Sequence, residues 1–209
     1  MHHIVNEEAR SLSHSAEEHD MRVAVAAWGR SRFHGCRCVH EVTLGDGRID
    51  LVFVGEKNLV GVEVKSGRDK LDRLDRQIAE YSRYLPEVWV AIAPKWEGKI
   101  KNSHRMNIIV VEGGGIRDAC PERRRPHRDD LVCTRLLEVL WRDEAARIAQ
   151  RTDVIPGSIP TNQPRHLILP MLARLLTGNE ILREVATELR GRPAFGAASD
   201  VPQRAEAAE

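Results

Sequence analysis

The chain has 209 residues, of which 42% are apolar and 30% are charged, and its formal net charge is +1. This size suits one ordinary domain with an apolar core, and the balanced charge excludes a globally basic nucleic-acid-binding protein. An aromatic content of 4% argues against a stacking platform for single strands.

The first ten residues, MHHIVNEEAR, are polar, and no apolar run approaches the roughly 20 residues that a membrane span needs. The sequence therefore predicts a cytoplasmic protein that does not bind membranes.

The first predicted helix covers residues 15–30, because Met21, Val25 and Trp28 recur at helical spacing. Three strands rich in β-branched residues are predicted next, at 37–44, 48–54 and 59–65. The GDG and GEKN segments that separate them are typical of hairpin turns.

An amphipathic helix is predicted over 70–85, where apolar residues are spaced three and four apart. Strands are predicted at 87–93 and 106–112, with a short basic segment between them. The order of strand, crossover helix and strand favours an α/β fold with a mixed sheet flanked by helices.

The composition changes after Glu112. We predict a flexible N-terminus at 1–14, a core at 15–112, and a basic loop or linker at 113–129. A helical C-terminal extension at 130–192 and a disordered tail at 193–209 complete the organisation. Within the extension, helices are predicted at 130–150, 165–176 and 179–190.

Charged residues interrupt two of the predicted core strands. Glu63 and Lys65 are two positions apart, so they share one face of their strand, and Asp50 can lie beside Glu63 if the strands form a hairpin. One interpretation is an exposed sheet face with a cross-strand ion pair. The apolar surroundings of both strands favour a buried site, where such charges must be paired or must bind a metal.

Two carboxylates provide the hard oxygen ligands that Mg²⁺ prefers, and a bound metal makes water nucleophilic and stabilises charge on phosphorus. A neighbouring lysine can orient that water or neutralise the transition state. The cluster therefore suits phosphodiester hydrolysis.

Asp50 followed thirteen residues later by Glu63-Val64-Lys65 resembles the motif of the PD-(D/E)XK nuclease superfamily, which has the restriction-endonuclease-like fold. Ile49 stands where that motif has proline. Gln77 and Tyr81, four residues apart, match the helix of the RecB-like branch. The segments GRIDLV, GVEVKS and DRLDRQIAEYSRYL resemble small bacterial proteins of this superfamily, and MmcB-like DNA-repair nucleases more distantly.

The resemblance covers about residues 15–112 and implies a deoxyribonuclease that uses Mg²⁺ or Mn²⁺ in DNA repair, restriction or defence. The implied catalytic residues are Asp50, Glu63, Lys65, Gln77 and Asp20. The implied metal ligands are Asp50, Glu63 and the Val64 carbonyl. Glu41 and Glu17 are possible additional acids. Glu18 also competes as the acid of the first helix, but a capping box that begins at Ser15 explains it structurally. The structural alternatives are a solvated helix position for Gln77 and a cross-strand partner of Arg48 or Lys65 for Glu41.

DNA is the expected partner, with RNA left open, and the protein could act as a homodimer or in a larger repair or defence complex. Residues expected to contact the nucleic-acid backbone are Arg68, Lys70, Arg73, Arg123, Arg124 and Arg125. The last three belong to a segment that is otherwise typical of a solvated loop. The alternative function is a non-catalytic nucleic-acid-binding protein or an accessory subunit on the same fold.

Overall fold

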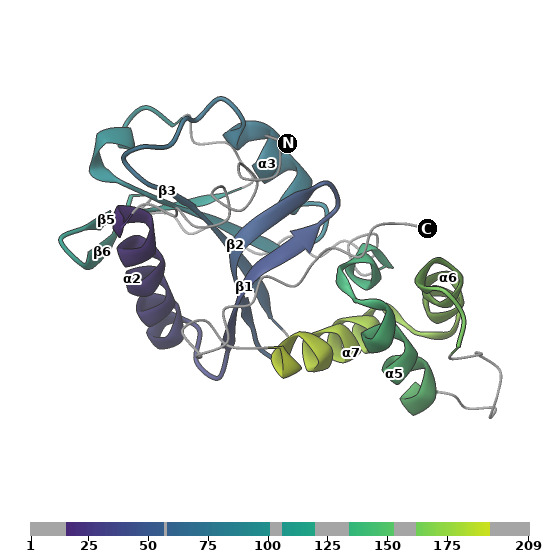
Figure 1. Cartoon of the computed structure of the whole chain (residues 1–209). Helices are drawn as coiled ribbons and strands as arrows, with labels where there is room; N and C mark the ends of the chain where they lie inside the picture. Colours follow the sequence, from purple (N-terminus) through teal and green to yellow (C-terminus); the bar gives the residue numbers. More distant parts are fainter. Residues whose placement is uncertain (1–15, 57, 101–105, 120–133, 153–161, 193–209) are drawn as a thin grey trace, which may run out of the picture.

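The computed structural model of the chain describes residues 16–56, 58–100, 106–119, 134–152 and 162–192. It contains one six-stranded mixed sheet with helices on both faces (Figure 1). The first described helix is α2 (Ala16–Arg32). The strands are β1 (Arg37–Leu44), β2 (Gly47–Val54), β3 (Leu59–Lys65), β4 (Glu87–Ile92), β5 (Asn107–Glu112) and β6 (Gly115–Asp118). The predicted α/β fold with a mixed sheet is confirmed.

The sheet has the strands in sequence order, β1 to β6. The first three strands form the predicted antiparallel meander, whereas β3, β4 and β5 are parallel to one another. Helix α3 (Leu74–Tyr81) lies in the crossover from β3 to β4, and the short 3₁₀ helix η1 (Pro94–Trp96) follows β4. This arrangement buries every residue of β3 and β4, as expected for strands covered on both faces.

Strand β6 was not predicted, and it lies in the segment predicted to be a loop. Gly113 and Gly114 have φ angles of +57° and +80°, and they form a tight turn that pairs β6 antiparallel with β5. A two-residue hairpin turn of this kind needs residues that adopt positive φ, which glycine does at low cost.

Each face of the sheet packs against different helices. Helix α2 covers one face, where Val25 and Ala26 contact a cluster that includes Phe53, Val62 and Trp89. Helix α3 and the C-terminal helices cover the other face and share one apolar cluster with it. The C-terminal helices are therefore joined to the same core as the sheet (Figure 1).

Helix α3 is shorter than predicted, since the α-helix begins at Leu74 and ends at Tyr81. Residues 71–73 and 82–84 form turns instead. Leu71 and Leu85 still pack against the core, so the apolar spacing that suggested a longer helix is satisfied by turns at both ends.

The predicted helix over 130–150 is interrupted in the structure. The 3₁₀ helix η2 (Leu137–Val139) ends at Leu140, whose extended backbone separates it from α5 (Arg142–Thr152). Two further helices follow, α6 (Arg165–Leu175) and α7 (Gly178–Gly191). Residues 1–14, 123–125 and 193–209, to which predictions were assigned, lie outside the described residues. Within the described residues, none of the helices combines the length and the apolar content that crossing a membrane would need.

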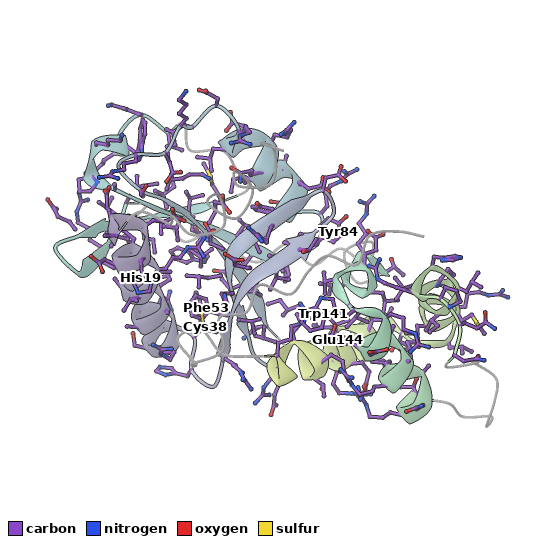
Figure 2. The ribbon with its side chains drawn as sticks, in the orientation of Figure 1. His19, Cys38, Phe53, Tyr84, Trp141 and Glu144 are labelled. Atoms are coloured by element: carbon purple, nitrogen blue, oxygen red, sulfur yellow. The ribbon has the colours of Figure 1, made fainter. Side chains whose placement is uncertain are left out.

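Gly29 packs α2 closely against a side chain of β2. A Cβ atom at this position would lie 1.9 Å from Cζ of Phe53, a fully buried ring beneath α2 (Figure 2). We expect Gly29→Ala to lower the free energy of unfolding by about 1–3 kcal/mol through overpacking, although alanine favours helix formation. Urea unfolding measures this change.

The matched control for this prediction is Gly191→Ala, because a Cβ there would meet no atom within 4 Å. Equal stability of the Gly29→Ala and wild-type proteins would contradict the close packing described here.

Candidate metal and catalytic site

The candidate site lies where β2 and β3 stop pairing. Their ladder ends at Leu51 opposite Val62, one position before Asp50 and Glu63. Beyond that point, Oδ2 of Asp50 accepts a hydrogen bond of 2.7 Å from the Val64 backbone N–H. The Asp50 carboxylate thus replaces a backbone acceptor at the point where the two strands separate.

The regular alternation of side chains between the two faces of the sheet is broken at Glu41 in β1 and at Asp50 in β2. Val39 and Val42 belong to the cluster on the α3 side of the sheet, and so do Ile49 and Val52. Residues three apart would lie on opposite faces of a regular strand. Glu41 has a φ angle of +54°, a left-handed conformation that no other described non-glycine residue adopts. This irregularity lets Asp50 reach a partner on α2.

Glu63 and Lys65 lie side by side on β3, as predicted, and are only 3% and 8% exposed. Nζ of Lys65 donates to Oε1 of Glu63 at 2.6 Å, and Nε2 of Gln77 donates to the same oxygen at 2.7 Å. Gln77 comes from α3 and its amide reaches back to the strand, while its catalytic role stays a prediction. Tyr81 lies one turn further along α3 and donates from its hydroxyl to the Arg48 carbonyl at 3.0 Å.

The carboxyl groups of Asp50 and Glu63 are both buried, and burial disfavours their charged forms. Burial raises the pKa of Glu63 to about 7, and the neighbouring Asp50 charge adds to this rise, while Lys65 and Gln77 oppose it. Burial also raises the pKa of Asp50, against the opposing effects of Arg22 and the Val64 N–H. The described cations therefore do not fully offset the cost of holding two negative charges here.

A divalent cation fits this donor set. Oε2 of Glu63 is buried and has no hydrogen-bond partner among the described residues, whereas its other oxygen accepts two hydrogen bonds. Buried carboxylate oxygens without a partner are costly, and Mg²⁺ and Mn²⁺ favour such oxygen ligands. No group of three His, Cys, Asp or Glu side chains in the described part of the chain is arranged for a metal. Water would then complete the coordination, together with the Val64 carbonyl if it takes part as predicted.

The acids of the first helix are placed differently from the prediction. Asp20, the favoured acid, is exposed, whereas Glu18 lies 3.1 Å from the Arg22 guanidinium. The spacing of Asp20 from Asp50 along the sequence carries no information on which face of α2 turns inward. Glu17 accepts a hydrogen bond of 2.8 Å from the backbone N–H of Gly67, in the turn that follows β3.

Glu41 lies at the edge of the site. Its carboxylate is 3.4 Å from Nη1 of Arg22 and 3.2 Å from Nη1 of Arg48. The Arg48 contact is the cross-strand pair that was considered as its structural role.

Arg22 is a site residue that the sequence analysis missed. It is 6% exposed, and its guanidinium donates to Asp50. The available signal was its position between Met21 and Val25, on the helix face that should be apolar. A charge at such a position needs a buried partner.

Arg68, Lys70 and Arg73 follow β3 and are exposed, which leaves their charges accessible to a phosphate backbone. The turn that carries Arg68 is fixed by Asp69, which accepts hydrogen bonds from the Ser66 N–H and hydroxyl at 2.7 Å. Arg123, Arg124 and Arg125 lie outside the described residues.

A sequence model of the family described as bacteriophage P4 protein cII matches residues 13–188. A comparison with curated proteins gave no match. Among solved structures, an SPO1766 protein of unknown function from Silicibacter pomeroyi is 16% identical with a TM-score of 0.47, covering 71% of this chain and 100% of that one. The SfsA protein of Pyrococcus furiosus in complex with Ca²⁺ is 16% identical with a TM-score of 0.30, covering 52% of this chain and 64% of that one. These two likenesses are too low to support an argument about function, and none of the matches names the PD-(D/E)XK superfamily.

Proposed function

The chain belongs to the bacteriophage P4 protein cII family, and we propose that it is a metal-dependent nuclease that hydrolyses phosphodiester bonds of DNA. The proposal rests on the chemistry of the cluster on β2, β3 and α3 and on the resemblance of its residues to the PD-(D/E)XK motif. The family description itself names no activity.

The observation that carries the proposal is the unpartnered Oε2 atom of Glu63. This oxygen is buried beside Asp50, and it belongs to a carboxyl group whose pKa is raised to about 7. A structural ion pair would be expected to use both oxygens or to expose the unused one. An acceptor that is buried but unused is instead suited to a cation that the protein binds.

The residues of the cluster have separate roles in this proposal. Asp50 and Glu63 hold Mg²⁺ or Mn²⁺, which when bound supplies an activated water and charge stabilisation at phosphorus. Lys65 holds its ammonium group at the same place, where it orients the attacking water or neutralises negative charge in the transition state. Gln77 fixes the Glu63 carboxylate through its 2.7 Å hydrogen bond.

DNA is the proposed substrate, and RNA is the alternative that substrate tests would reveal. Arg68, Lys70 and Arg73 would hold the backbone without reading its sequence, and Arg123–Arg125 would add to them. The proposed setting is DNA repair, restriction or defence in the cytoplasm. Cutting both strands of a duplex would require a homodimer, two binding events or a larger complex.

The test is cleavage of labelled linear, circular and branched DNA with Mg²⁺, with Mn²⁺ and with EDTA. We expect cleavage by the wild-type protein that requires the metal and that is lost in Asp50→Asn. Asp143→Asn is the matched control, because that acid is exposed on α5 and its side chain is 76% accessible. It should cleave like the wild-type protein.

DNA binding without cleavage in every condition would overturn the nuclease proposal and favour a non-catalytic binding protein. Cleavage that occurs only after a partner protein is added would identify an accessory subunit.

A further inference from the structure

Arg22 is the only described cation whose guanidinium contacts three acids of the site region. It donates to Oδ1 of Asp50, and it lies 3.4 Å from Glu41 and 3.1 Å from Glu18. The Arg22 side chain is 7% exposed, and its Nε atom is buried without a hydrogen-bond partner among the described residues. A buried guanidinium that leaves a donor unused is not in its best possible geometry.

Arg22 and a metal would compete for the same carboxylate. Oδ2 of Asp50 accepts the Val64 N–H and Oδ1 accepts Arg22, so both Asp50 oxygens are engaged. Oε2 of Glu63, in contrast, has no partner. A cation held by both residues meets no hydrogen-bond donor at Oε2 of Glu63, but at Asp50 it would share one carboxylate with the guanidinium, and the two positive charges would repel each other.

Two other acids, Glu18 and Glu41, already contact Arg22 and could bind its guanidinium after it leaves Asp50. Glu18 is one helical turn before Arg22 on α2, and Glu41 is opposite Asp50 on β1. Their side chains are 20% and 25% exposed, so both carboxylates are partly hydrated and are less buried than Asp50.

We propose that Arg22 is a positioning residue that holds Asp50 in the metal-free protein and shifts to Glu18 and Glu41 when a divalent cation binds. This inference rests on the proposed metal site of Asp50 and Glu63. By thermodynamic reciprocity, whatever holds Arg22 on Asp50 weakens metal binding, and whatever draws it towards Glu18 strengthens metal binding.

The first test measures Mn²⁺ binding by calorimetry in wild-type, Arg22→Gln, Glu18→Gln and doubly substituted protein. We expect Arg22→Gln to bind Mn²⁺ at least about fivefold more tightly, the lower end of typical coupling between sites. Glu18→Gln should bind it more weakly, because the displaced guanidinium loses a partner. In the Arg22→Gln background, Glu18→Gln should have a smaller effect on affinity than it has alone.

The second test measures thermal unfolding with EDTA and with saturating Mn²⁺. Arg22→Gln should lower the unfolding midpoint by roughly 5–10 °C in EDTA, because three acids lose one of their positive partners, and Mn²⁺ should close at least half of that gap. Arg192→Gln is the matched control. Arg192 is also 6% exposed and is paired with Glu144 of α5, at 2.7 and 2.6 Å. Mn²⁺ should not change the amount by which Arg192→Gln lowers the unfolding midpoint.

The outcomes separate the two proposals. If wild-type protein binds Mn²⁺ and Asp50→Asn does not, but Arg22→Gln binds with equal or lower affinity, the role of Arg22 is overturned and the metal site stands. An equal effect of Glu18→Gln with and without Arg22 would also overturn it. If wild-type and Arg22→Gln proteins both fail to bind Mn²⁺, the metal site and the role of Arg22 are both overturned.

Discussion

Lys65→Met is expected to lower the rate of metal-dependent DNA cleavage by about 10²–10³-fold while leaving Mn²⁺ binding detectable. The reason is that Lys65 contributes a charge to the site without being a metal ligand. Its Nζ lies 2.6 Å from Oε1 of Glu63, whereas Oε2, the proposed metal ligand, has no hydrogen-bond partner among the described residues. Single-turnover cleavage and Mn²⁺ calorimetry on the same preparation separate these two effects.

Lys99→Met is the control for the loss of one lysine. Lys99 is exposed, and its Nζ lies 5.5 Å from the centre of the Trp96 ring, where its charge contacts no acid of the cluster. A Lys65→Met protein that cleaves DNA at the wild-type rate would contradict the assigned role of Lys65.

The stability of the metal-free protein is expected to depend on pH through Glu63. The pKa of this carboxyl rises from the ordinary 4.5 to about 7, first because it is buried and second because Asp50 is nearby. A raised carboxyl pKa means that the folded protein binds more protons than the unfolded chain between these values. The contribution of Glu63 to the free energy of unfolding is therefore greatest below about pH 4.5, and it is lost as the pH rises to about 7.

The expected size of this change is about 3 kcal/mol in the free energy of unfolding. Urea unfolding in EDTA, compared between the wild-type protein and Glu63→Gln at each pH, isolates it from other titrating groups. Saturating Mg²⁺ should remove most of the wild-type decline, because the metal stabilises the ionised carboxylate. If the free energies of unfolding of the two proteins differed by a constant amount from pH 4.5 to 8, the raised pKa of Glu63 would be contradicted.

The parts of the site that were predictable from the sequence are those set by strand periodicity and a short loop. The two-residue spacing of Glu63 and Lys65 places them on one face of any strand, and the short connection between β2 and β3 brings the two strands into an antiparallel pair. The α3 helix then follows closely enough in the chain for Gln77 to reach Glu63.

The contacts of α2 with the site could not be predicted in the same way. Whether Asp20 or Glu18 faces the cluster depends on how α2 is rotated over the sheet, and this depends on tertiary packing such as that of Gly29 on Phe53. The change of face at Glu41 and Asp50 is also a tertiary effect, since a glutamate with positive φ has no signature in a strand pattern. These two features together place Arg22 on Asp50.

Two predicted helices had the wrong boundaries for a related reason. Leu71 and Leu85 have helical spacing, yet they lie outside the helix and still pack against the core. Leu140 has an extended backbone although the apolar pattern continues through it. In both places tertiary packing uses the apolar residues without requiring the helix that their spacing suggests.

The most direct test of the metal site is anomalous diffraction from crystals of the wild-type protein grown with Mn²⁺. We predict an anomalous peak within coordination distance of Oε2 of Glu63 and of the Asp50 carboxylate, with the Arg22 guanidinium moved away from Asp50. A protein saturated with Mn²⁺ whose map shows no peak between these two carboxylates would contradict the proposal that they form the metal site of a nuclease.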